Sequence, residues 1–320
     1  MPLKWDPDFN EAVKPLVAAQ AANPRPPMTD PLVIRQTVDP ALAKLLSLIP
    51  KVSGVAHETH QIQSFDGHTI AVHRYYKEGV EKSTPALVHA HGGGTIMGTT
   101  DMFDPYLRGF ALKSGVQIFT VDYRLAPENP FPTPVEDVYA GLAWVSQHAA
   151  DFSVDPARIG IMGESAGGNL AAAAALIARD RALSPPLAKQ ILVYPMLDDR
   201  NTQPYPALEG LVMWTTEQTV TAWTAYLGKD FGTDRVTEYA APARAKSVDG
   251  LPPTYLEIGN LDIFLGETLQ YASRISQANI DVELHVYPSL PHGYDIFAPL
   301  SAPAKRAVEE RIQAASLMWL

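Results

Sequence analysis

Short apolar segments rich in Val, Ile, Leu and aromatic residues recur along most of the chain, and we expect each to form a β-strand. Six of them cover residues 86–91, 117–123, 158–162, 190–194, 254–258 and 282–287. Ahead of these, residues 58–65 and 68–76 alternate apolar and polar side chains on either side of Asp66-Gly67. That arrangement is typical of a β-hairpin with a tight turn.

Segments with the apolar periodicity of an α-helix lie between most of the expected strands, for instance residues 135–148, 169–180 and 266–277. Alternation of strand and helix predicts a mainly parallel sheet with helices on both of its faces. Such sheets place their functional sites at the carboxyl ends of the strands, so we look for candidate residues just after each strand.

Two stretches do not follow the alternation. Residues 1–50 contain nine prolines, and Asp6-Pro7, Asp30-Pro31 and Asp39-Pro40 each resemble a helix N-cap followed by proline at the first helical position. Residues 198–240 show no strand pattern, but residues 215–226 fit a helix that begins with a capping box of Thr215 and Gln218. We therefore expect N-terminal cap helices in residues 1–50, a core in 51–197 and 241–320, and a helical cap insertion in 198–240.

The composition and net charge of the chain exclude several classes of partner and of functional site. At 320 residues and 46% hydrophobic the chain can bury one large core, and a net charge of -10 argues against a nucleic-acid partner. The absence of cysteine excludes disulfides, thiolate metal sites and a cysteine nucleophile. The longest apolar run, residues 170–178, is too short to span a bilayer, and the first residues do not resemble a secretion signal. We expect a cytoplasmic protein with no stable membrane insertion.

The most informative motif is Gly163-Glu164-Ser165-Ala166-Gly167, which fits the pattern G-x-S-x-G. It lies between the expected strand at 158–162 and a helical segment at 169–178. A serine between strand and helix, with small residues two positions either side, is what a nucleophile elbow requires, since the backbone turns sharply there and exposes the hydroxyl. Ser165 is therefore the candidate nucleophile.

A serine hydroxyl needs a histidine to accept its proton and a carboxylate to orient that histidine. In this class of fold the acid and then the histidine follow the serine along the chain. Asp262 follows the strand at 254–258, and His292 follows the strand at 282–287. Asp198, which follows the strand at 190–194, stays open as an alternative acid. His89 and His285 lie within expected strands, where a structural role is favoured.

A separate motif is the candidate for stabilising the negative charge that develops during attack by the serine. His91-Gly92-Gly93-Gly94 directly follows the strand at 86–91, and three glycines leave no side chains between backbone N–H groups and a developing oxyanion. The N–H of Ala166, next after the candidate nucleophile, is a further donor. A flexible turn is the alternative interpretation of the glycines.

Together these motifs and the segment Tyr123-Arg124-Leu125-Ala126-Pro127-Glu128 resemble the hormone-sensitive lipase family of α/β-hydrolases, from about residue 58 to the end of the chain. The resemblance implies an α/β-hydrolase fold, with a mainly parallel eight-stranded sheet flanked by helices and a helical cap. Three positions depart from the pattern usual in the family, namely Glu164 in place of aspartate, Ile263 in place of proline and Tyr294 in place of phenylalanine. They affect subfamily and substrate and leave every catalytic group present.

The resemblance also implies a role for each candidate site residue. Ser165 would be the nucleophile, His292 the general base and acid, and Asp262 the carboxylate that orients His292. The oxyanion hole would be formed by the N–H groups of three residues: Gly93, Gly94 and Ala166. His91 and residues 124–128 would brace the loops around the site.

We therefore expect a serine carboxylesterase that acts on short- to medium-chain esters, with a small-molecule ester as its partner and no cofactor or metal. Met97, Met213 and Trp214 are expected to line the substrate pocket beneath the cap. An amidase, lactonase or deacetylase with the same triad is an alternative, as is a non-catalytic small-molecule receptor on this scaffold. Late strands often pair between copies in this architecture, which leaves room for a homodimer.

Overall fold

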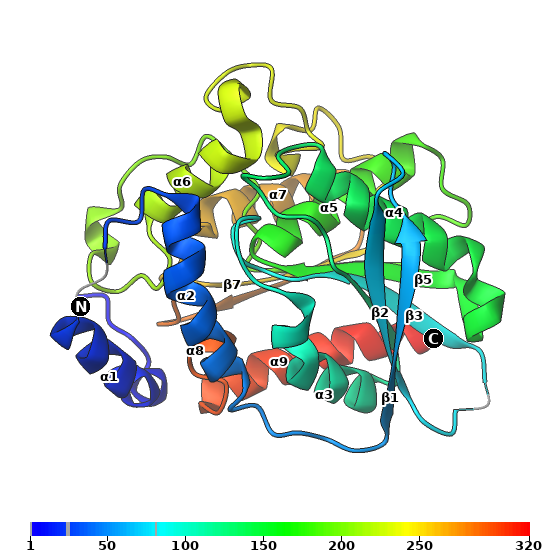
Figure 1. The fold of residues 1–320 in the computed structure, drawn as a ribbon, viewed down its shortest axis with the longest axis horizontal. Coiled ribbons are helices and arrows are strands. Elements are labelled where there is room, and N and C mark those ends of the chain that lie inside the picture. Colours follow the sequence, from blue (N-terminus) through cyan, green and yellow to red (C-terminus); the bar gives the residue numbers. More distant parts are fainter. Residues whose placement is uncertain (1, 24–25, 81) are drawn as a thin grey trace.

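The computed structural model describes residues 2–23, 26–80 and 82–320, and its centre is an eight-stranded sheet in the order β1-β2-β4-β3-β5-β6-β7-β8 (Figure 1). The strands are β1 (Val55–Gln63), β2 (Thr69–Lys77), β3 (Thr84–Ala90), β4 (Gln117–Val121), β5 (Val154–Glu164), β6 (Gln190–Val193), β7 (Thr254–Gly259) and β8 (Val282–Tyr287). All strands from β3 to β8 pair in parallel, whereas β2 is antiparallel to both β1 and β4. The predicted fold class is confirmed.

Helices cover both faces of the sheet, while α1, α2 and α6 lie on the left in Figure 1. Along the chain they are α1 (Pro7–Ala22), α2 (Pro31–Leu46), α3 (Asp104–Ser114), α4 (Thr133–Gln147), α5 (Ala166–Asp180), α6 (Thr216–Leu227), α7 (Leu265–Gln277), α8 (Tyr294–Phe297) and α9 (Ala302–Ser316). Helices α3 and α9 pack together on one face, and α4 and α5 pack together on the other. Helix α6 and the start of α2 lie beside each other on the upper left of Figure 1.

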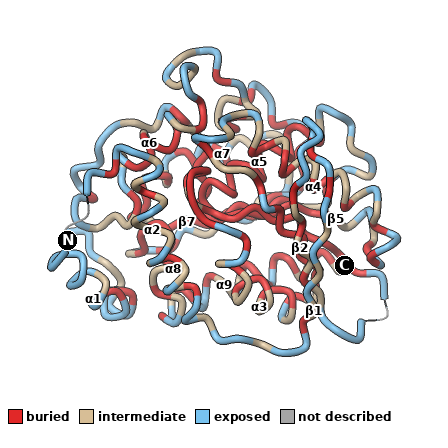
Figure 2. The backbone as a smooth tube through the Cα atoms, in the orientation of Figure 1, coloured by how far each residue is buried: buried red, intermediate tan, exposed pale blue. Residues whose placement is uncertain are grey.

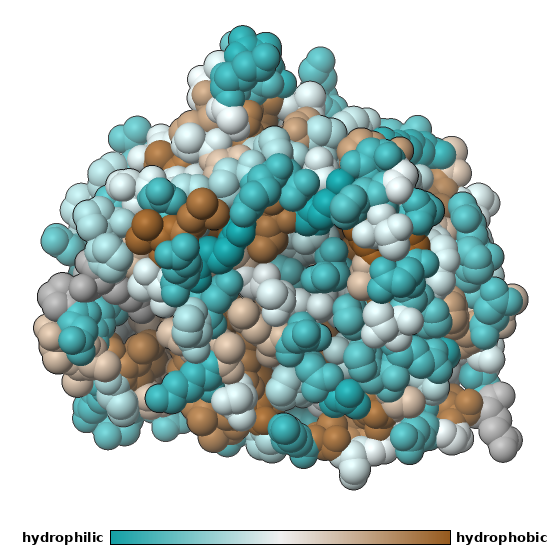
Figure 3. All heavy atoms as spheres, viewed as in Figure 1, coloured by the Kyte–Doolittle hydropathy of each residue, from teal (hydrophilic) through white to brown (hydrophobic). Residues whose placement is uncertain are grey.

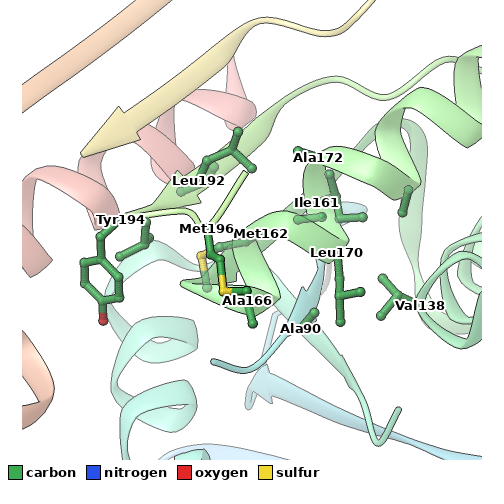
Figure 4. Packing of buried hydrophobic residues seen from close by; sticks show 14 of the residues in the cluster. Ala90, Val138, Ile161, Met162, Ala166, Leu170, Ala172, Leu192, Tyr194 and Met196 are labelled. Carbon is green, nitrogen blue, oxygen red and sulfur yellow. The ribbon is translucent and has the colours of Figure 1, made fainter. Parts of the chain in front are cut away.

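Helix α5 packs on β5, β6 and β3 in the middle of the sheet, and Figure 2 shows the middle of the sheet as buried. Every residue of α5 from Ala166 to Ala178 is buried. Figure 4 shows Ala166 and Leu170 of this helix lying among Ile161 and Met162 of β5 and Met196 beyond β6. Because alanine has a small side chain, a run of alanines lets α5 approach the strands closely. This close packing holds the N-terminus of α5 at a fixed distance from the sheet.

The N-terminal helices begin as their sequences predict, except at one position. Asp6 and Asp30 accept hydrogen bonds from the first backbone N–H groups of α1 and α2. The expected helix start at Asp39-Pro40 is wrong, because Pro40 lies inside the continuous helix α2. The Asp39 carboxylate instead accepts a hydrogen bond from the N–H of Gly98 at 3.0 Å, and burial raises its pKa.

The helix expected in the 198–240 stretch is present as α6, and its capping box between Thr215 and Gln218 is complete. The division of the chain into core and cap segments stays a prediction. Within the described ranges no helix is both long and apolar enough to cross a lipid bilayer.

Candidate active site

The turn between β5 and α5 holds Ser165 in a strained backbone conformation, with φ 56° and ψ -118°. The two flanking glycines make this turn possible. A Cβ at Gly163 would lie 2.2 Å from the carbonyl oxygen of Gly167, and one at Gly167 would lie 2.0 Å from that of Ala90. No residue other than glycine fits at either position, which gives the G-x-S-x-G pattern its physical basis here.

Ser165, His292 and Asp262 form a continuous chain of hydrogen bonds. The Ser165 Oγ lies 2.8 Å from His292 Nε2, and His292 Nδ1 lies 2.6 Å from Asp262 Oδ2. The other carboxylate oxygen of Asp262 accepts the N–H of Phe264 at 2.9 Å. Since all three side chains are buried, the imidazole is held in one orientation with Nε2 free to accept the serine proton.

The loops that carry Asp262 and His292 follow neighbouring parallel strands, β7 and β8, and are joined to each other. The N–H of Leu261 donates to the carbonyl of Leu290 at 3.0 Å. The side-chain oxygen of Asn260 accepts the N–H of Ser289 at 2.6 Å. These cross-links hold the carboxylate and the imidazole at a fixed separation although they are 30 residues apart in the chain.

The ring of His292 packs between two aromatic rings that no motif in the sequence predicts. Tyr194 meets it at 4.8 Å between ring centroids and Phe264 at 5.1 Å, both in edge-to-face geometry. The Tyr194 hydroxyl donates to Asp295 Oδ1 at 2.7 Å, and Asp295 is in turn bound by the buried guanidinium of Arg311. This buried network fixes Tyr194 and with it one side of the His292 imidazole.

The glycine turn after β3 lies directly against the elbow. A Cβ added at Gly92 would be 3.5 Å from the Cβ of Ser165. Gly93 has φ 131° and Gly94 has φ 61°, and the N–H of Met97 closes the turn on the carbonyl of Gly93 at 3.0 Å. Positive φ at both glycines turns the local backbone in a way that other residues rarely adopt.

Ala166 follows Ser165 directly and is the first residue of α5. The first N–H groups of a helix have no partner within the helix, and the helix dipole there favours negative charge. The glycine turn and the start of α5 thus bring backbone N–H groups from two separate elements close to Ser165. This arrangement is suited to an oxyanion.

The residue before Ser165, Glu164, forms a buried hydrogen bond with a histidine of β3. Glu164 Oε2 lies 2.9 Å from His89 Nε2, and His89 Nδ1 lies 2.9 Å from Thr120 Oγ1. Burial alone would raise the pKa of Glu164, but the charge of and hydrogen bond to His89 outweigh burial and lower it. His89 therefore has the structural role expected of a histidine within a strand.

A cavity of about 70 Å³ opens above Ser165 and His292. The three side chains expected to line the substrate pocket, Met97, Met213 and Trp214, all border it. The indole of Trp214 packs on Gly94 so closely that a Cβ there would lie 3.0 Å from the ring, and its Nε1 donates to Thr219 at 2.9 Å.

The alternative acid, Asp198, does not join this group. Its carboxylate oxygens accept hydrogen bonds from the guanidinium of Arg200, both at 2.7 Å. Across residues 2–23, 26–80 and 82–320, no group of three or more His, Asp or Glu side chains is arranged to hold a metal ion.

Comparison with known proteins gives consistent matches. A family model described as "alpha/beta hydrolase fold" matches residues 87–296. The chain is 32% identical over 313 residues to "Carboxylesterase NlhH" of Mycobacterium tuberculosis, covering 90% of this chain and 98% of that protein. It is 29% identical over 232 residues to "Ethyl acetate hydrolase" of Pseudomonas putida, covering 72% of each. The solved structure "Bacterial Heroin Esterase" superposes with a TM-score of 0.88 at 33% identity, covering 98% of both chains.

Proposed function

The chain belongs to the hormone-sensitive lipase family of α/β-hydrolases and is a carboxylic ester hydrolase, and from this premise we propose that it cleaves short- to medium-chain esters through Ser165, His292 and Asp262. The observation that carries the proposal is the unbroken chain of hydrogen bonds from Ser165 Oγ through His292 to Asp262. That geometry is what nucleophilic attack by a serine hydroxyl requires.

In the acylation half of the reaction, Ser165 Oγ attacks the ester carbonyl carbon while its proton passes to His292 Nε2. The carboxylate of Asp262 stabilises the resulting imidazolium through the bond at Nδ1. The N–H groups of Gly93, Gly94 and Ala166 bind the oxyanion of the tetrahedral intermediate. His292 then gives its proton to the leaving alkoxide, the C–O bond breaks, and an acyl-enzyme on Ser165 remains.

Deacylation repeats these steps with water as the nucleophile. His292 Nε2 takes a proton from the water as it attacks the acyl carbonyl, the same N–H groups bind the second oxyanion, and His292 returns the proton to Ser165 Oγ. The carboxylic acid is released and the resting hydroxyl is restored. Each N–H donor in such an oxyanion hole is typically worth about 10²–10³-fold in rate.

The size of the cavity and the names of two relatives support a short acyl group. The space above Ser165 is about 70 Å³, which suits a small acyl group better than a long chain. One relative is named for hydrolysis of ethyl acetate and another as a carboxylesterase. The location in the cytoplasm stays a prediction, and the homodimer for which this architecture leaves room has no signal in the sequence.

Trapping of the acyl-enzyme tests the proposal. The wild type and Ser165→Ala are mixed with p-nitrophenyl butyrate, quenched in acid during turnover and digested for mass spectrometry. The wild-type peptide that contains Ser165 should carry one butyryl group, and the variant should carry none. Turnover with the butyryl group on another residue, or with none attached, would overturn the covalent mechanism.

A further inference from the structure

Asn201, in the loop after β6, makes three hydrogen bonds through its side chain. Its Nδ2 donates to the carbonyl oxygen of Ile263 at 3.0 Å and to Glu267 Oε2 at 2.8 Å. Its Oδ1 accepts the hydroxyl of Tyr205 at 2.8 Å. Because a side-chain amide has two N–H donors, both bonds at Nδ2 form at once, and these partners determine which way the amide points.

The carbonyl of Ile263 belongs to the peptide group that orients Asp262. This carbonyl and the N–H of Phe264 are parts of one peptide group, which is planar and rigid. The N–H donates to Asp262 Oδ1 at 2.9 Å, while Asp262 Oδ2 lies 2.6 Å from His292 Nδ1. Asn201 therefore holds one side of a planar group whose other side holds the carboxylate. Hydrogen bonds in such a chain polarise one another, so the bond at Ile263 also strengthens the bond to Asp262.

The loop that carries Asn201 is itself fastened by Glu267. Glu267 is buried in the first turn of α7, a short way along the chain from Asp262. Its Oε1 accepts the N–H of Leu197 at 2.6 Å and that of Asp198 at 3.2 Å. The loop after β6 is thus bound at several points to the start of α7, and this fixes the position from which Asn201 reaches Ile263.

The third bond of Asn201, to Tyr205, lies on the side of the solvent. Tyr205 is 40% exposed, and all of residues 203–207 are exposed. Figure 3 shows hydrophilic and hydrophobic residues mixed over the face that contains α2 in Figure 1, as expected of a surface in contact with water. Because water can replace a hydroxyl at an exposed position, the bond from Tyr205 contributes less to the orientation of the amide than the two bonds at Nδ2.

We propose that Asn201 is a positioning residue for Asp262 and acts through the peptide group that joins Ile263 to Phe264. This inference rests on the proposed function. When His292 takes the proton of Ser165, Asp262 stabilises the imidazolium, and Asn201 keeps the carboxylate aligned with Nδ1 during that step. Asn201 does not border the cavity above Ser165, so binding of the ester does not depend on it.

Steady-state kinetics of Asn201→Leu with p-nitrophenyl acetate test the inference. The value of kcat should fall about tenfold, as for loss of an ordinary hydrogen bond that matters only in the transition state, and KM should stay within about twofold. Asn201→Ala is the second variant, because its short side chain leaves room for water if leucine disturbs the loop.

Two further variants serve as controls. Asn23→Leu also removes a side-chain amide that donates to a backbone carbonyl, that of Ala19, and should change neither kcat nor KM. Tyr205→Phe removes only the bond at Oδ1 and should lower kcat less than about threefold. A fall in kcat of Asn23→Leu equal to that of Asn201→Leu would overturn the inference.

A double-mutant cycle separates positioning of Asp262 from a general loss of structure. In the background of Asp262→Ala, Asn201→Leu should lower kcat by less than about a further twofold, because the carboxylate through which it acts is absent. An equal factor in both backgrounds would overturn the inference. So would lower melting temperatures of Asn201→Leu and Asn201→Ala with unchanged kcat. If Asp262→Ala alone leaves kcat unchanged, the proposed triad is refuted, and this inference with it.

Discussion

Arg35 of helix α2 and Glu128 of the core form a bidentate ion pair, with nitrogen-to-oxygen distances of 2.7 and 2.8 Å. The same guanidinium donates to the carbonyls of Ile96 at 2.6 Å and Ala126 at 2.7 Å. Ile96 belongs to the turn that begins at Gly93, so an N-terminal helix is fastened to the backbone proposed to bind the oxyanion. Helix α2 thus both borders the cavity at Ser165 and supports the glycine turn.

Replacing Arg35 should slow the chemical step more than it weakens substrate binding. We expect Arg35→Met to lower kcat about tenfold with little change in KM, since complete loss of one oxyanion donor costs about 10²–10³-fold and this variant only loosens the turn. Steady-state kinetics with p-nitrophenyl acetate and a thermal unfolding curve measure this.

The pair of Arg181 and Glu136, also bidentate, supplies the matched control because it joins the end of α5 to α4 and makes no bond to the glycine turn. Arg181→Met should leave kcat unchanged. If both variants lose activity equally, or if Arg35→Met changes only the melting temperature, Arg35 has no positioning role.

Asp262 and Asp198 should respond very differently to loss of charge. Asp262→Asn keeps the shape of the site but changes the histidine tautomer that is stabilised, and the same change in a serine protease costs about 10⁴-fold in kcat. Asp198→Asn breaks only the bonds to Arg200 and should change kcat less than about threefold. Comparison of kcat for the two variants is the test, and the reverse ranking would assign the acid to the loop after β6.

His91 should make stability depend on pH. Burial lowers its pKa from 6.5 to about 4, while in the unfolded chain it titrates near its ordinary value. Between these values the unfolded state binds more protons, so the stabilisation is complete above about pH 6.5 and is lost as pH falls to about 4. The shift corresponds to roughly 3 kcal/mol, at about 1.4 kcal/mol for each pKa unit.

Urea unfolding of the wild type, His91→Gln and His68→Gln from pH 4 to 7 measures this dependence. The His91 variant should lose most of the pH dependence of the unfolding free energy in that window. His68→Gln, at an exposed turn position, should retain it. Equal pH dependence in all three proteins would show that His91 is not the titrating group.

The sheet could be predicted from the sequence because each strand depends on a local signal. The same holds for Ser165 at the elbow and for the candidates in the loops after β7 and β8. Short apolar segments mark β3 to β8, and the glycines of the elbow are required by contacts within a few ångströms of Ser165. Chain order then indicated His292 and left Asp262 and Asp198 as candidates for the acid, and the structure brings His292 and Asp262 to Ser165.

The surroundings of the site could not be predicted in this way. Arg35, Tyr194 and Asn201 act through side-chain contacts between segments far apart in the chain, and no periodicity or motif marks such contacts. Asp39-Pro40 shows the limit of a local rule, since the same residue pair starts a helix at Asp30-Pro31 and lies within that helix nine residues later.

The central claim is that Ser165 is the nucleophile of an esterase for short- to medium-chain substrates. It is tested most directly by hydrolysis of p-nitrophenyl esters, from acetate to palmitate, by the wild type and Ser165→Ala side by side. The account predicts that the wild type works best on esters of short to medium chain length. It also predicts that Ser165→Ala unfolds at the wild-type temperature but hydrolyses these esters no faster than the uncatalysed reaction. Turnover that persists in Ser165→Ala would contradict it.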